Sequence, residues 1–209
     1  MELYRQTQYR GFNIDIYYDP DPESPREWDN LGTIYTAHRR YRPEKEFDDH
    51  FDIEEVFADR IGNFSAAFNR AYIALPIYMY DHSGVTISTS PFSCHWDSGF
   101  FGIVAVSLDK VRKEYGWKKI TSSRRKKIEG YLLGEVQLLD NYYTGEVYGF
   151  RVVSVEDHTE EIDSCWGYYG SDGLEQIESE CKDIINLTHK KRGIQLFLPF
   201  IEFPELAII

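Results

Sequence analysis

The feature that most constrains this chain is an unbroken apolar and aromatic run over residues 71–80, which ends in the turn sequence Asp81-His82-Ser83-Gly84. A run of this length bounded by turn residues is typical of a buried strand. Residues 85–90 alternate apolar and hydroxyl side chains, so they predict a second strand in a hairpin with the first. Pro76 has no N–H to donate, which places it at an edge or a bulge. The apolar residues 100–107 add a third strand, and the three strands predict a β-meander.

Further strands and helices follow from the periodicity of the apolar residues. A period of two predicts strands at residues 12–18, 31–38, 146–155 and 161–166. The first two of these are expected to pair antiparallel. Helical spacing predicts helices at residues 43–62, 107–116, 121–141 and 174–187. This set of elements predicts an α+β fold: a single domain with a mainly antiparallel sheet and three to four helices packed on it.

Two of the predicted helices have apolar faces that identify core residues. The helix at 121–141 places four on one face: Ile128, Leu132, Val136 and Leu139. The helix at 43–62 has a weaker set near helical spacing: Phe51, Val56, Phe57 and Ile61. Ser107 precedes the helix at 107–116 as its expected N-cap.

At 209 residues the chain fits a single domain, which we divide into three regions. Residues 1–42 form N-terminal strands and a loop, residues 70–185 form the core, and residues 193–209 form a C-terminal arm. The arm is apolar and contains two prolines, so we expect it to be extended and to pack against the body or a partner. A second copy of the chain is one such partner, which would make the protein a homo-oligomer.

The charge distribution bears on the class of partner. The net charge is −12, which repels a nucleic-acid backbone and disfavours direct nucleic-acid binding. A dense basic stretch from Lys110 to Lys127, which includes Trp117, departs from this balance. It suits either charge pairing, within the molecule or with a partner, or phosphate binding at a helix start. Charge pairing is the favoured interpretation.

Acidic residues are concentrated on the outer face of the helix predicted at 43–62. They are Asp48, Asp49, Asp52, Glu54, Glu55 and Asp59. One interpretation is a solvated helix face. The sharper one is an acidic surface that imitates the phosphates of a nucleic acid.

The sequence also predicts where the protein resides and the state of its thiols. No apolar run is long enough to span a membrane and the N-terminus lacks an apolar leader, so we expect a cytoplasmic protein without membrane contact. Cys94, Cys165 and Cys181 are odd in number and lack CxxC spacing, which indicates reduced thiols rather than disulfides or a structural zinc site. No cofactor is expected.

Three short blocks, residues 81–84, 94–99 and 163–170, combine Ser, Gly and polar or aromatic side chains at strand ends. As a catalytic set they offer Cys94 or Cys165 as nucleophile and His82 or His95 as base. The carboxylate that orients the base would come from Asp81, Asp97 or Asp163. The same residue types also build ordinary turns, which is the favoured interpretation. A metal site from His82, His95 and Asp97 is disfavoured, because the spacing of a metal motif is missing.

The blocks are also candidates for a binding surface. Its residues would be Asp81, His82, Trp96, Asp97, Ser98, Asp163, Trp166 and Tyr168. In a meander the first two blocks lie about 20 Å apart, one strand length, unless the intervening loop folds back over the sheet.

The strings at residues 74–84, 86–99 and 163–170 resemble those of an uncharacterised family of phage and prophage proteins, with motifs of the form YDHSG, SPFSCxWDSG and DSCWGxYG. The resemblance covers roughly residues 70–185. It implies an accessory phage protein that acts in the cytoplasm of an infected bacterial host cell.

Three functions remain in contention. The leading one is a non-enzymatic anti-defence protein of the anti-CRISPR type, which binds and inhibits a host defence protein by protein contact and acidic mimicry of nucleic acid. The first alternative is an enzyme or small-ligand binder whose pocket, formed by the three blocks, takes a nucleotide or phosphorylated ligand. The second is an assembly protein that oligomerises through residues 193–209.

Overall fold

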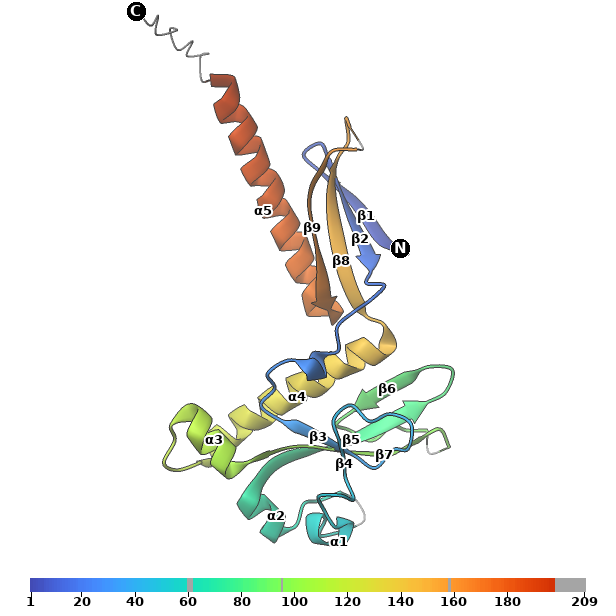
Figure 1. Cartoon of the computed structure of the whole chain (residues 1–209), viewed down its shortest axis with the longest axis vertical. Helices are drawn as coiled ribbons and strands as arrows, with labels where there is room; N and C mark the ends of the chain where they lie inside the picture. The colour runs from blue at the N-terminus through green and yellow to red at the C-terminus, as the bar shows by residue number, and fades with distance from the viewer. Residues whose placement is uncertain (60–61, 95, 158, 198–209) are drawn as a thin grey trace, which may run out of the picture. The chain divides into compact units, whose positions relative to one another are not determined.

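The computed structural model describes residues 1–59, 62–94, 96–157 and 159–197, of which 191–197 are described by their backbone only (Figure 1). The chain forms two compact units. The terminal unit combines Met1–Pro20 with Tyr148–Ile209, and the central unit is Asp21–Val147. The predicted α+β class, with mostly antiparallel strands and helices packed on them, is confirmed.

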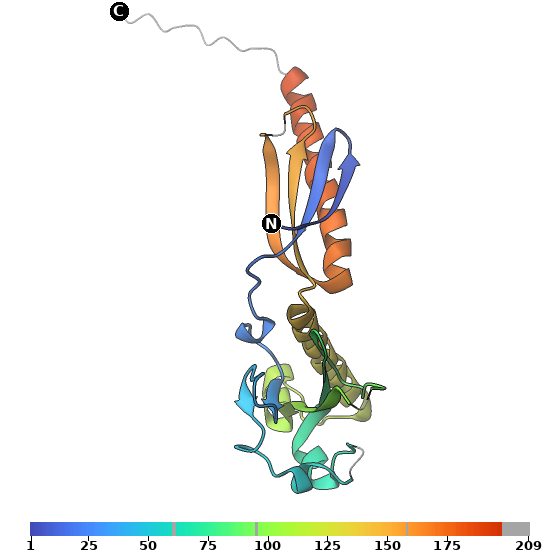
Figure 2. The ribbon, with the colours of Figure 1, turned by 90° about the vertical axis from the view of Figure 1, so that its right-hand side faces the viewer.

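The terminal unit is a four-stranded sheet with one long helix along it (Figures 1 and 2). In spatial order its strands are β1 (Leu3–Tyr9), β2 (Phe12–Tyr18), β8 (Val147–Ser154) and β9 (Glu161–Tyr169). Helix α5 (Gly170–Phe197) buries Ile177, Cys181 and Ile185 against this sheet. Phe12, Ile14 and Ile16 of β2 belong to the same core, as their alternation predicts.

The central unit is a five-stranded sheet with helices on both faces (Figures 1 and 2). In spatial order the strands are β4 (Lys45–Glu46), β3 (Thr33–Thr36), β7 (Ser98–Ser107), β5 (Tyr72–Asp81) and β6 (Val85–Ser88). Only β3 and β4 pair parallel in this sheet. The helical segments are η1 (Pro25–Glu27), α1 (Ile53–Val56), α2 (Ala66–Ala71), α3 (Leu108–Tyr115) and α4 (Ser122–Thr144).

The two faces of the central sheet have separate cores. Val104 and Val106 pack with the α4 residue Leu132 on one face. Ile103 and Ala105 pack with Phe47, Val56 and Phe68 on the other face. Because neighbours along β7 alternate between the two cores, this strand is buried on both sides, which explains why its sequence is continuously apolar.

The predicted ends of α3 and the predicted start and buried face of α4 are confirmed, whereas α4 ends three residues later than predicted. The Ser107 Oγ accepts the N–H of Lys110 at 3.1 Å as the N-cap of α3, and Gly116, with φ of +65°, ends that helix. Thr121 caps α4, which runs to Thr144. Its buried residues are the four predicted ones: Ile128, Leu132, Val136 and Leu139.

The helix predicted at residues 43–62 is wrong over most of its length. Residues 45–46 form β4, and only Ile53–Val56 are helical, with the Asp52 carboxylate accepting the N–H of Glu54 at 2.8 Å. Phe57 then pairs with Phe64 across an isolated β-bridge. Burial of the Phe residues against the sheet outweighs helix propensity here, and the Asp residues favour turns and caps. Ile61, assigned to the helix face, lies outside the described residues.

The predicted meander and the predicted partner of residues 31–38 are also wrong. The hairpin of β5 and β6 forms as expected, but β7 pairs with β5 on the side away from β6. Strand β3 pairs with β7 and β4, not with the first predicted strand. Pro76 pairs with Ile103 beyond the end of β6, with a bulge next to it, as its missing N–H predicts.

The C-terminal segment is more helical than the sequence suggests. Helix α5 extends through Phe197, so residues 193–197 are not an extended arm, and residues 198–209 lie outside the described part. None of the described helices is both long and apolar enough to cross a membrane. Strand β1 was not predicted, because most of its side chains are polar and exposed.

The closest backbone approach in the central sheet yields a test of the fold. A Cβ on Gly102 would lie 2.0 Å from the backbone oxygen of Tyr35 on β3. We expect Gly102→Ala to lower the free energy of unfolding by about 3 kcal/mol, because backbone cannot yield as a side chain does. Gly130→Ala, at an exposed α4 position with free space for a Cβ, is the control and should raise it by about 1 kcal/mol. Equal effects of the two changes in chemical denaturation would contradict this packing.

The three free thiols provide a second test. Cys165 is exposed on β9, whereas Cys181 is buried between α5 and the sheet, and burial raises the pKa of the Cys181 thiol from 9.0 to about 12. Because the thiolate is the reactive form, Cys181 should resist a thiol reagent from pH 8 to pH 10 until the protein unfolds. Cys165 should react first, and Cys165→Ser should remove the fastest labelling phase. Fast labelling of Cys181 in the folded protein would show that this core is wrong.

Candidate functional site

The pairing of β5 with β7 brings the first two sequence blocks together. Tyr80 is opposite Ser98, and the N–H of Asp81 donates to the carbonyl oxygen of Asp97 at 2.9 Å. The separation of about 20 Å expected for a meander therefore does not apply, since the loop folds back and both blocks lie at the same end of the sheet. We call the side chains of Asp81, His82, Cys94, Trp96, Asp97 and Ser98 the turn cluster.

The Asp97 carboxylate is at the centre of the turn cluster. One of its oxygens lies 3.4 Å from the Nδ1 of His82 and 3.7 Å from the Sγ of Cys94. The Ser98 hydroxyl donates to the carbonyl oxygen of Cys94, which fixes the start of β7. Asp81 forms an ion pair with Arg40 at 2.5 Å. The cluster is therefore a set of polar contacts that hold two turns together.

This order of contacts does not match nucleophilic catalysis. A cysteine nucleophile needs an imidazole beside its sulfur, with the carboxylate on the far side of that ring. Here the carboxylate of Asp97 stands between Cys94 and His82. His95, the other candidate base, lies outside the described residues. Within the described part of the chain, no three His, Cys, Asp or Glu side chains are placed to hold a metal ion.

Trp96 is the most exposed large apolar side chain of the turn cluster, with 95% of its surface accessible. It borders a small cavity of about 320 Å³ that His38, Asp81, Asp97 and Phe100 also line. Because this indole is exposed to water, it does not stabilise the fold through burial. Trp side chains of this kind are frequent anchors in protein interfaces.

The third block lies on β9, in the terminal unit. Trp166 packs over Gly149, where a Cβ would come within 2.1 Å of the indole, and beside the Tyr17 ring at 6.2 Å. Tyr168, predicted on a binding surface, is instead buried in the core, where its hydroxyl donates to Glu180 at 2.8 Å and burial raises its pKa. Asp163 and Cys165 are exposed on the same strand.

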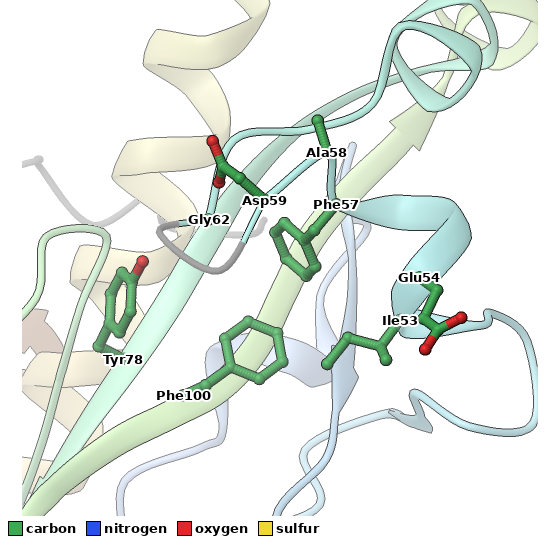
Figure 3. Close-up of a pocket in the computed structure, with 8 residues that line it drawn as sticks. All are labelled: Ile53, Glu54, Phe57, Ala58, Asp59, Gly62, Tyr78 and Phe100. Atoms are coloured by element: carbon green, nitrogen blue, oxygen red, sulfur yellow. The ribbon is translucent and has the colours of Figure 1, made fainter.

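A larger pocket of about 570 Å³ opens beside Tyr78 of β5 and Phe100 of β7, and the sequence did not reveal it (Figure 3). Its lining residues are Ile53, Glu54, Phe57, Ala58, Asp59, Gly62, Tyr78 and Phe100. The rings of Phe57 and Phe100, with centroids 5.5 Å apart, form its apolar wall. Figure 3 shows the Glu54 and Asp59 carboxylates at its margin. We call this feature the acid-rimmed pocket.

Three local structures hold the acid-rimmed pocket open. The bridge between Phe57 and Phe64 turns the chain after α1. The Asp59 carboxylate accepts two hydrogen bonds from Asn63, one from its backbone N–H at 3.0 Å and one from its side-chain amide at 2.7 Å. Gly62 has φ of +92°, and a Cβ there would lie 2.9 Å from the Tyr78 hydroxyl oxygen. Gly62, the last residue of the helix predicted at 43–62, is thus required by a turn against β5.

The acidic residues predicted at 48–59 are all exposed, but they do not share one helix face. Glu54 and Glu55 lie on α1, and Asp52 caps it. Asp48 and Asp49 lie in the turn that follows β4, and Asp59 lies beyond the β-bridge. The acidic residues therefore lie on turns and on the short helix α1, and two of them, Glu54 and Asp59, line the acid-rimmed pocket.

No protein-family model, curated protein or solved structure matches this chain. What the protein binds must therefore be inferred from its own side chains. In the central unit, the exposed Trp96 of the turn cluster and the acid-rimmed pocket both offer apolar surface that a partner could cover. Phe100 lines the cavities beside both, so the two features are neighbours.

Proposed function

We propose that this protein is a non-enzymatic phage accessory protein that binds and inhibits a host defence protein. The acid-rimmed pocket would receive an apolar side chain from a basic segment of that partner. The phage setting rests on the motif resemblance of residues 74–99 and 163–170. The observation that supports binding is an open aromatic pocket of about 570 Å³ whose rim is acidic.

The pocket wall has the chemistry of an interface anchor site. Phe57, Tyr78 and Phe100 present ring surface, and Ile53, 53% exposed, adds an aliphatic side chain at the entrance. Binding energy in protein interfaces concentrates where one large side chain fills such a concavity. Trp96 offers a second contact next to it.

The rim charges favour a cationic partner. The carboxylates of Glu54 and Asp59 line the pocket, and the same stretch of chain carries four more exposed acids: Asp48, Asp49, Asp52 and Glu55. Proteins that bind nucleic acid carry basic grooves, because they must neutralise phosphates. An acidic surface of this kind speeds association with such a groove and then occupies it. Defence nucleases and RNA-guided effectors have such grooves, which makes them the expected partner class.

Substitution at the pocket entrance tests this proposal. We expect Ile53→Asp to weaken binding to the inhibited effector at least tenfold, since it puts a charge where an apolar side chain must be buried. Leu187→Asp is the matched control, because Leu187 is also an exposed aliphatic residue, at 58%, but lies on α5. It should leave the dissociation constant within twofold of that of the unsubstituted protein. Calorimetry with purified CRISPR effectors and restriction enzymes measures both.

Neutralising the rim tests the electrostatic part. The variant Asp48→Asn, Asp49→Asn, Glu54→Gln, Glu55→Gln retains Asp52 and Asp59, whose carboxylates hold backbone N–H groups. We expect a slower association rate that depends less on salt, with a smaller effect on dissociation. If none of the tested defence effectors forms a complex with the protein or loses activity, the proposed function is overturned. An unchanged association rate would overturn the role of the acids alone.

A further inference from the structure

The basic stretch at Lys110–Lys127 forms a surface with its own geometry. Trp117 stacks on Tyr115 with ring centroids 4.6 Å apart and planes at 27°. Tyr115 lies parallel to Tyr131 at 6.3 Å and 9°. The Arg124 guanidinium lies over the Trp117 ring at 4.7 Å, and the Lys127 ammonium lies over Tyr131 at 5.6 Å. We call these five residues the aromatic–basic surface.

The fold places these residues together by a tight helix connection. Helix α3 ends at Tyr115, Gly116 takes a left-handed conformation, and α4 begins at Ser122. Lys127 and Tyr131 are four residues apart on α4 and so lie on one face. The Arg124 guanidinium also donates to the carbonyl oxygen of Lys119 at 2.7 Å, which holds it over the indole.

Most cations of this region have no carboxylate partner within the described residues. Among the described residues, no ion pair includes Lys118, Lys119, Arg124, Lys126 or Lys127. The four lysines are exposed, and Tyr131 is 44% exposed. Arg112 pairs with Asp109, but these five cations do not make the charge pairing favoured from the sequence within the described part of the molecule, so their positive charge is available to a ligand.

We propose that the aromatic–basic surface binds single-stranded nucleic acid. Ring faces and guanidinium planes stack unpaired bases, while neighbouring cations neutralise the phosphates between them. An acidic protein segment would use the lysines but would leave the exposed Tyr131 ring unused. A duplex keeps its bases stacked inside, so it would contact only the charges. The combination of rings and cations thus selects an unpaired strand.

The net charge of −12 opposes such binding but does not prevent it. The Debye length is about 8 Å at physiological ionic strength, so a phosphate in contact with Lys118 or Lys127 is affected mainly by nearby charges. The nearby carboxylates oppose binding: Glu114 and Glu135 both contribute to raising the pKa of Tyr115, and Glu129 lies two residues from Lys127 on α4. Glu135 is already paired with Arg26. The expected affinity is therefore modest and strongly dependent on salt.

Fluorescence anisotropy of a labelled oligothymidylate with the whole chain tests the proposal. We expect binding at low salt that Lys118→Gln with Lys127→Gln weakens at least tenfold. The slope of log K against log salt should fall by about 1.4, since each phosphate contact on a single strand contributes about 0.7. The control pair Lys182→Gln with Lys190→Gln makes the same change in net charge at exposed α5 positions and should alter binding less than twofold.

A second variant tests the stacking. Tyr131→Leu keeps an apolar side chain at an exposed position and should weaken oligothymidylate binding about tenfold, within the range for one stacked base. A matched duplex should compete poorly. The proposal is overturned if oligothymidylate does not bind, if the control pair loses as much affinity as the test pair, or if polyglutamate competes equally and Tyr131→Leu has no effect. The last result would identify an acidic protein as the ligand. None of these outcomes depends on the partner proposed for the acid-rimmed pocket.

Discussion

The antiparallel pairing of β5 with β7 is the constraint on which the central unit depends. It runs from Tyr72 opposite Ser107 to Tyr80 opposite Ser98, and it forms the middle of the sheet. Both strands contribute side chains to the two cores. Because the end of β5 and the start of β7 coincide, this pairing also creates the turn cluster and brings Tyr78 and Phe100 to the acid-rimmed pocket. The site is thus a consequence of strand order.

A buried ion network holds the segment that precedes β3, whose sequence has no apolar periodicity. The Arg26 guanidinium, only 2% exposed, pairs with Glu44 at 2.6 Å and with Glu135 of α4 at 3.0 Å. It also donates to the carbonyl oxygen of Gly32, while Glu135 accepts the N–H of Leu31. Each charged group in the network is hydrogen-bonded, and these interactions offset the free-energy cost of removing the charges from water. Loss of one partner would leave an unpaired buried charge. It links η1 and the residues just before β3 and β4 to α4.

Elements whose hydrogen bonds join residues near one another in the sequence could be predicted from the sequence. Elements that depend on contacts between distant residues could not. The hairpin at 72–88 and the caps of α3 and α4 depend on neighbouring residues such as Ser107 and Gly116, so their patterns are diagnostic. The partner of β7 depends on the close approach of Gly102 to β3, which no local pattern encodes. The motifs identified the residues of the turn cluster, but their proximity depends on the pairing of β7 with β5, which the predicted meander did not contain. No motif identified the acid-rimmed pocket, because its wall combines rings from three separate segments.

The separation of charge across the central sheet gives both proposed surfaces a common physical basis. Phe47 and Val56, which flank the acidic turns, pack on the face of Ile103, whereas Ile128 and Leu132 of the basic helix pack on the face of Val104. A folded chain that places its acids and bases on opposite faces cannot neutralise one with the other. Each surface then attracts the opposite charge from outside: a basic protein segment on the α1 side and phosphates on the α4 side. A nucleic-acid-binding partner supplies both chemistries, the basic groove and the strand it holds, so the two surfaces are compatible with one target.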